Sequence, residues 1–101
     1  MRLTIVPADS VVHVDGVALR VDCFGVVDSE APNAVIHAVQ WNDTAGWIEY
    51  VRDPFDPAPL GNRPISDISQ FQAAIDAWAN ARAVAAAVTN AAAAATPVVK
   101  P

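Results

Sequence analysis

The chain has 101 residues, 53% of them hydrophobic, and a formal net charge of −5. This length predicts a single domain. The acidic balance argues against nucleic acids and anionic membranes as partners, because both are bound through clusters of Lys and Arg. The acidity lies early in the chain: residues 1–64 carry nine acidic and four basic residues, and residues 65–101 carry two of each.

The N-terminal part of the chain has the pattern of three short strands. Residues 2–6 form a β-like run, and residues 10–14 and 17–22 are β-branched runs separated by Asp15-Gly16. Asp-Gly between alternating apolar residues favours a two-residue type I′ hairpin, because both turn positions need a positive φ. We therefore expect a hairpin with its turn at these two residues.

The middle of the chain predicts a second hairpin between two irregular segments. Residues 23–34 are rich in turn-forming residues and are interpreted as a loop. Residues 35–41 and 47–51 have strand patterns and are joined by a hairpin loop over 42–46, which gives four or five strands in an antiparallel meander. Residues 52–64 contain four prolines and predict an irregular connector.

Two tryptophans flank the loop of this second hairpin. Trp41 ends one predicted strand and Trp47 begins the next, so they are placed to face each other across the hairpin. Aromatic cross-strand pairs of this kind stabilise a sheet by roughly 0.2–1 kcal/mol each.

A long alanine-rich helix is predicted after the connector. It begins near Ser66 or Asp67, where Asp67 and Gln70 loosely fit the capping-box pattern. It continues to about Ala95, because alanine has the highest helix propensity. Thr96-Pro97 then ends it.

The first half of this helix carries an apolar stripe, which we expect to cover one face of the sheet. The stripe consists of Ile68, Phe71, Ile75 and Trp78 and thins afterwards to Ala81, Val84 or Ala85, Val88 and Ala92. About 29 residues at 1.5 Å each reach roughly 43 Å, so the distal half should project beyond so small a sheet.

The sequence therefore predicts an α+β protein, in which a small antiparallel β-meander of two hairpins is packed by one long C-terminal alanine-rich helix. Residues 1–78 form the β-module with the docked start of the helix, and residues 79–101 form the projecting helix and a short tail. Small side chains let helices approach closely, so the projecting part is predicted to contact a partner or a second copy of the chain. The alternative is a solvated helix held by alanine propensity.

No complete catalytic or metal-binding pattern is present in the sequence. His13 and His37 lie in predicted strands without the ligand spacing of a metal site. Nothing near Cys23 in the chain supports a catalytic thiol, and this residue is interpreted as a buried structural thiol. Asp53 and Asp56 precede prolines, where Asp commonly makes local turns. We therefore predict a protein that is not an enzyme and that uses neither a cofactor nor a metal.

The N-terminus and the cysteine content bear on the compartment. No long apolar run precedes Pro7, so we expect no signal peptide. The alanine tract is interrupted by Asn80, Arg82 and Asn90 and is interpreted as part of a soluble protein. A single cysteine permits no intramolecular disulfide, which favours the cytoplasm.

Several segments in a fixed order carry a family resemblance. They are Ile36-His-Ala-Val-Gln-Trp41, Gly46-Trp-Ile-Glu-Tyr50, Asp53-Pro54, Asn62, Ile65-Ser-Asp-Ile68, Phe71-Gln72 and Ile75-Asp-Ala-Trp78. Together they resemble small proteins encoded among the tail and tail-fibre genes of tailed bacteriophages and prophages. The resemblance covers about residues 35–78, and the chain departs from it afterwards, where alanines replace charged helix residues.

The resemblance implies a virion component or an assembly factor that acts by protein–protein binding, in the tail of the particle or in the host cytoplasm during assembly. Its partner is expected to be a phage tail or fibre protein, or a second copy bound through the C-terminal helix. The alternative hypothesis is an inhibitor or regulator that offers its acidic β half to a basic host protein. The candidate interface residues are Trp41, Trp47, Tyr50, Ala81, Val84, Ala85, Val88 and Ala92.

Overall fold

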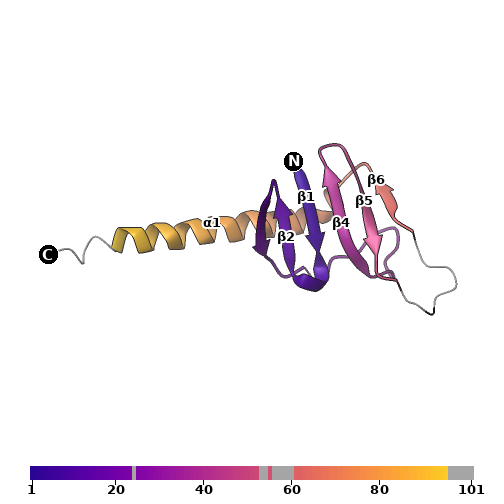
Figure 1. The fold of residues 1–101 in the computed structure, drawn as a ribbon, viewed down its shortest axis with the longest axis horizontal. Coiled ribbons are helices and arrows are strands. Elements are labelled where there is room, and N and C mark those ends of the chain that lie inside the picture. Colours follow the sequence, from indigo (N-terminus) through magenta and orange to yellow (C-terminus); the bar gives the residue numbers. More distant parts are fainter. Residues whose placement is uncertain (24, 53–54, 56–60, 96–101) are drawn as a thin grey trace.

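The computed structural model describes residues 1–23, 25–52, 55 and 61–95, with side chains as far as Val88. These residues form one antiparallel sheet and one long helix (Figure 1), which confirms the predicted α+β class. The strands are β1 (Arg2–Val6), β2 (Val11–Val14), β3 (Val17–Arg20), β4 (Ile36–Asn42), β5 (Ala45–Tyr50) and β6 (Arg63–Ile65).

The strand order is β3-β2-β1-β4-β5-β6, so two three-stranded meanders meet at β1 and β4. The sequence predicted a simple meander of four or five strands, in which β4 would follow β3. The central place of β1 has a physical reason: Leu3 and Ile5 are fully buried and need neighbours on both sides. Ile5, for example, lies between Val12 of β2 and Val39 of β4.

Strand β6 begins inside the segment that the sequence predicted as an irregular connector, and it ends one residue beyond it. Arg63–Ile65 pairs with β5, and Pro64 lies opposite Trp47. A proline is tolerated here because β6 is an edge strand, where the missing N–H need not remove a ladder hydrogen bond.

The two hairpins differ in how well their turns were predicted. The first has its turn at Asp15 and Gly16, both with positive φ (49° and 85°), as expected for Asp-Gly. The second turns at Asp43 and Thr44 alone, so the predicted five-residue loop is wrong.

This shorter turn sets a register that separates the two tryptophans. Trp41 lies opposite Gly46, and Trp47 lies opposite Gln40. Because successive residues of a strand point to opposite faces, Trp41 is buried in the core whereas Trp47 is 44% exposed on the other face. The prediction that they face each other is therefore wrong.

The helical segment begins later than the sequence predicted. A 3-10 turn over Ser69–Phe71 leads into α1 (Gln72–Ala95). The Asp67 carboxylate accepts hydrogen bonds from the Ser69 N–H (2.8 Å) and hydroxyl (2.9 Å). Gln70 does not complete a capping box, because its Oε1 accepts a hydrogen bond from the Ser29 N–H instead.

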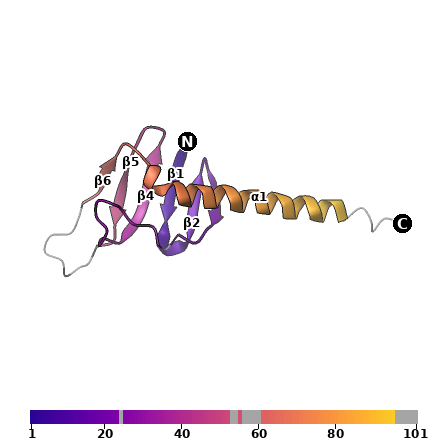
Figure 2. The same cartoon turned by 180° about the vertical axis from the view of Figure 1, so that it is seen from behind.

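Helix α1 and the segment 25–35 lie on the same side of the sheet (Figure 2). The core between them and the strands includes Phe71, Ala74 and Trp78, and Ile68 and Ile75 pack at its margin, which confirms the predicted stripe. The opposite face, seen in Figure 1, carries no covering layer among the described residues. Its central row contains Ala18, His13, Thr4, Gln40, Trp47 and Pro64.

Candidate interaction surface

Trp78 marks the point at which α1 leaves the sheet. Its indole N–H donates to the Val17 carbonyl of β3 at 3.0 Å, and β3 is the edge strand. The Arg82 guanidinium lies 5.3 Å from the centre of the Trp78 ring, a cation–π distance. Beyond this contact the helix continues past the edge of the sheet (Figures 1 and 2).

One line of apolar side chains on α1 passes from packed to exposed at this point. It consists of Ala77, Ala81, Val84 and Val88, whose spacings of four, three and four residues place them on one side of a helix. Ala77 and Ala81 are half-buried, whereas Val84 is 55% and Val88 is 63% exposed. We call these four residues the α1 flank.

The first residue of the α1 flank, Ala77, lines a shallow apolar hollow where the helix still lies over the sheet. Ala73, Ala74 and Ala77 line this hollow of about 330 Å³ together with residues from the segment where the chain leaves β3, namely Asp22, Cys23, Gly25, Val26 and Val27. Of these residues, Cys23 is buried and Val26 is half-buried. The exposed valines therefore continue a surface that is already apolar beside the sheet.

A buried ion pair holds the covering segment 25–35 to the other end of the sheet. The fully buried Asp28 carboxylate accepts two hydrogen bonds from Arg63, from Nε and Nη2, at 2.6 Å each. Tyr50 donates its hydroxyl hydrogen to the same carboxylate, and the Glu30 N–H donates to it at 3.0 Å. A buried carboxylate needs such partners, since an unpaired one is costly.

This network shifts the pKa values of its members. The Arg63 hydrogen bonds hold the pKa of Asp28 well below its ordinary value and raise the pKa of Arg63 itself. Burial, followed by the hydrogen bond to Asp28, raises the pKa of Tyr50. Asp28 therefore remains ionised near neutral pH and serves to fix the fold.

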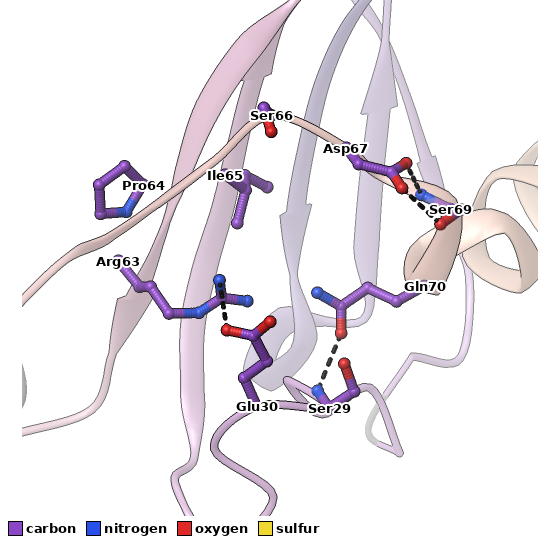
Figure 3. A pocket seen from close by; sticks show the side chains of 9 residues that line it. All are labelled: Ser29, Glu30, Arg63, Pro64, Ile65, Ser66, Asp67, Ser69 and Gln70. Carbon is purple, nitrogen blue, oxygen red and sulfur yellow. Dashed lines mark hydrogen bonds and ion pairs between the residues drawn. The ribbon is translucent and has the colours of Figure 1, made fainter.

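A polar pocket of about 270 Å³ lies beside this network (Figure 3). Arg63 Nη1 is 3.2 Å from Glu30 Oε2 across it, and the Ser29 N–H donates to Gln70 Oε1 at 2.9 Å. The polar groups of the pocket are bonded to one another. The bond between Ser29 and Gln70 joins the segment 25–35 to the start of the helical segment and so helps to hold α1 on the sheet. Its lining contains no His or Cys, and the Asp67 carboxylate that accepts from the Ser69 hydroxyl is also bonded to the Ser69 N–H.

The predicted aromatic interface residues separate into two groups. Trp41 and Tyr50 are buried and belong to the core. Trp47 is exposed on the uncovered sheet face, where its indole N–H donates to Glu49 Oε2 at 2.8 Å. Only Trp47 of these three aromatic residues is therefore accessible to a partner.

The helical candidates lie together on or beside the α1 flank. Ala81, Val84 and Val88 belong to it, and Ala85 is an exposed neighbour. Ala92 lies in α1, but its side chain is outside the described part of the structure.

The structure does not bring the candidate chemical residues together. His13 is half-buried on the uncovered face, and His37 is exposed at an irregularity in β4. Cys23 is buried, and burial followed by the charge of Asp22 raises its thiol pKa. Among the described residues, no group of three or more His, Cys, Asp or Glu side chains is placed to hold a metal ion. Asp53 and Asp56 lie outside the described residues.

Sequence reasoning missed the Asp28–Arg63 pair completely. The two residues are 35 positions apart, one in a turn-rich loop and the other in a proline-rich connector. Nothing local distinguishes Asp28 from exposed turn-forming aspartates. Only the pairing of β5 with β6 brings Arg63 over the loop.

Two further findings bear on the class of protein. No helix in the described residues is long and apolar enough to cross a membrane. Comparisons with family models, curated proteins and solved structures found no match for this chain.

Proposed function

We propose that this protein is a tail-associated structural or assembly protein of a tailed bacteriophage and acts by binding another protein. The observation that supports binding is the α1 flank, which leaves the sheet at Trp78 and exposes Val84 and Val88 on a projecting helix. Large apolar side chains in a regular line on an isolated helix are typical of a helix-in-groove or helix–helix contact. The phage setting rests on the sequence resemblance over residues 35–78.

The placement of the buried aromatic residues narrows the surface that is available. Trp41 and Tyr50 support the fold, so the candidate interface residues that remain accessible are those of the α1 flank and, on the other side of the sheet, Trp47. The flank is the stronger candidate because it is continuous, whereas Trp47 is an isolated exposed aromatic residue with its N–H already bonded to Glu49.

The alternative of an acidic inhibitor has less support from the geometry. Asp28 and Glu30 are engaged by Arg63, and Asp43 is paired with the N-terminal amino group. These internal pairs neutralise part of the charge that would steer a basic partner to the β half.

The proposal is tested in particles of the phage or prophage that encodes the chain. Val84→Asp places a charge on the α1 flank, and Ala86→Asp places the same charge on another side of the helix as the control. The chain is quantified in purified particles by mass spectrometry, and infectious particles are counted for each variant.

A structural subunit is present in particles in fixed stoichiometry, and Val84→Asp lowers both its incorporation and the titre. An assembly factor is absent from particles, yet Val84→Asp still lowers the titre. In both cases Ala86→Asp behaves as wild type. Absence from particles together with a normal titre for Val84→Asp would overturn the proposal.

A further inference from the structure

The β3 edge of the sheet presents unpaired main-chain groups. The Val21 N–H donates to the Ser10 carbonyl at 2.8 Å, and this bond fixes the parity of the β2–β3 ladder, because hydrogen-bonded pairs alternate with non-bonded pairs. By this parity the N–H and C=O groups of Ala18 and Arg20 point away from the sheet. No described residue pairs with them, and such an edge is a template for another strand.

The two edges of the sheet differ in how they are protected. The opposite edge, β6, has three residues, and one of them is Pro64. Short strands and prolines blunt an edge against pairing. Strand β3 has four residues and contains no proline, and Arg20 is its single charged residue. The open edge is also the one past which α1 projects.

The length of the projecting helix indicates how wide a partner beside β3 must be to cover the exposed side chains of α1. Val88 lies ten residues beyond Trp78, which is about 15 Å along the helix. Strands in a sheet are about 4.8 Å apart, so this length spans roughly three further strands. A single added peptide strand would cover about a third of it and leave Val88 exposed. A second sheet covers all of it.

The direction of the α1 flank fits a second helix at the same junction. Pairing two β3 strands antiparallel about a two-fold axis joins the sheets and places both helices antiparallel on one face. The second helix then lies toward the C-terminal end of β3. Ala73 and Ala77 line the hollow on this side of α1. The axis passes about half a strand spacing beyond β3, so symmetry brings Val84 and Val88 of each copy beside the Ala73–Ala77 hollow of the other.

We propose that the partner of this surface is a second copy of the chain, in a symmetric dimer that joins the two sheets through their β3 edges and packs the two α1 flanks against each other. This inference rests on the proposed function in one respect only, namely that the α1 flank is a binding surface. It names the occupant of that surface and adds the β3 edge to it.

The first test is the mass of the full chain in solution across a concentration series, by light scattering or sedimentation equilibrium. Wild type and the control Ala86→Asp should reach about twice the 10.6 kDa of one chain. Val84→Asp should raise the dimer dissociation constant by about 100-fold or more, because the dimer would bury an unpaired carboxylate. Ala18→Pro should have a comparable effect, since it removes an outward N–H of the edge without removing a bond to β2.

The second test places the contact. Ala18→Cys introduces an exposed thiol beside the proposed two-fold axis, and Ala45→Cys introduces one at an exposed position of β5. A short thiol cross-linker should join two Ala18→Cys chains at low protein concentration and should not join Ala45→Cys chains. The native thiol of Cys23 is buried and does not compete.

The outcomes separate this inference from the proposed function. A wild-type chain that stays a monomer at all concentrations overturns the dimer, as does a dimer that Val84→Asp leaves intact. A dimer that Val84→Asp dissociates while Ala18→Cys fails to cross-link overturns the β3 pairing. If the wild-type chain is a monomer and Val84→Asp still lowers the phage titre, the dimer alone is refuted. If Val84→Asp dissociates the dimer but leaves the titre normal, and the chain is absent from particles, the phage function alone is refuted.

Discussion

Arg63→Met removes the guanidinium from the buried Asp28 carboxylate and keeps most of the apolar length of the side chain. Asp28 is fully buried and receives its two 2.6 Å hydrogen bonds from Arg63. The Tyr50 hydroxyl and the Glu30 N–H would remain as partners, but neither carries a positive charge. The variant therefore tests how much the ion pair contributes to holding the segment 25–35 on the sheet.

The expected loss is about 3 kcal/mol in the free energy of unfolding. Breaking a buried pair by removing one partner costs about 3–5 kcal/mol. The lower end applies because the Arg63 side chain is 27% exposed, so water can reach part of the vacated site. Single domains are stable by about 5–15 kcal/mol, so this loss is a large part of the total.

The assay is urea unfolding at one fixed protein concentration, followed by far-ultraviolet circular dichroism. A loss of about 3 kcal/mol lowers the midpoint by about 1–3 M urea. Asp43→Asn is the matched control, because Asp43 forms an exposed ion pair with the N-terminal amino group and exposed pairs contribute little. Fixed concentration matters because association with a second copy would add to the apparent stability.

The contribution of the ionised Asp28 carboxylate to stability should also depend on pH, and the direction of its pKa shift determines the direction of this dependence. The pKa of Asp28 is lowered in the folded protein by Arg63, so its ionised form stabilises the fold above the ordinary Asp pKa of about 3.9. This stabilisation is lost as the pH falls through the folded-state value. The difference in stability between wild type and Asp28→Asn should therefore be full near pH 7 and shrink below about pH 4. An unchanged midpoint for Arg63→Met, or a difference that stays constant down to acid pH, would show that the Asp28–Arg63 ion pair does not stabilise the fold.

Three further predictions concern the hairpin, the helix contact and the thiol. A Cβ on Gly46 would lie 2.0 Å from the Gln40 carbonyl oxygen, so Gly46→Ala should lower the free energy of unfolding by at least about 1–3 kcal/mol, measured by urea unfolding. Gly25 has open space around it, so the control Gly25→Ala should not lower it. Equal unfolding midpoints for the two variants would contradict this prediction. Trp78→Phe loses the hydrogen bond to the Val17 carbonyl and should cost about 0.5–1.5 kcal/mol, and no loss would show that this bond does not hold the helix. The raised pKa and burial of Cys23 predict slow labelling by a thiol reagent at pH 8 in the folded protein and fast labelling in urea; similar rates would show that the thiol is accessible.

The sequence specified the local features of this fold better than its long-range pairings. The Asp15-Gly16 turn was predictable because its backbone requirement is carried by two adjacent residues. The stripe of Phe71 and Trp78 was predictable because helical spacing is regular. By contrast, the pairing of β1 with β4 joins segments about 36 residues apart, and no local pattern records it.

The features that were predicted incorrectly have equally specific physical causes. A turn two residues long, in place of five, shifts the register by one and moves Trp47 to the uncovered face. Strand β6 was not predicted because it contains Pro64 and lies in a proline-rich run, which normally argues against a strand. Pro64 is permitted because β6 is an edge strand, and an edge position is a property of the tertiary structure. The α1 flank was predicted in part: Ala81, Val84 and Val88 were predicted interface residues, but Ala77 was not. The side of the helix that remains exposed depends on where the sheet ends.

Hydrogen exchange of the α1 amides over residues 82–88, measured at protein concentrations on both sides of the association midpoint, shows whether the projecting helix binds a second copy of the chain. These residues extend past β3, and a helix without packing exchanges its amides readily. If the projecting helix is an association surface for a second copy, protection of these amides should rise with concentration and should be lost in Val84→Asp but not in Ala86→Asp. Protection that does not change with concentration, or that Val84→Asp leaves intact, would contradict it.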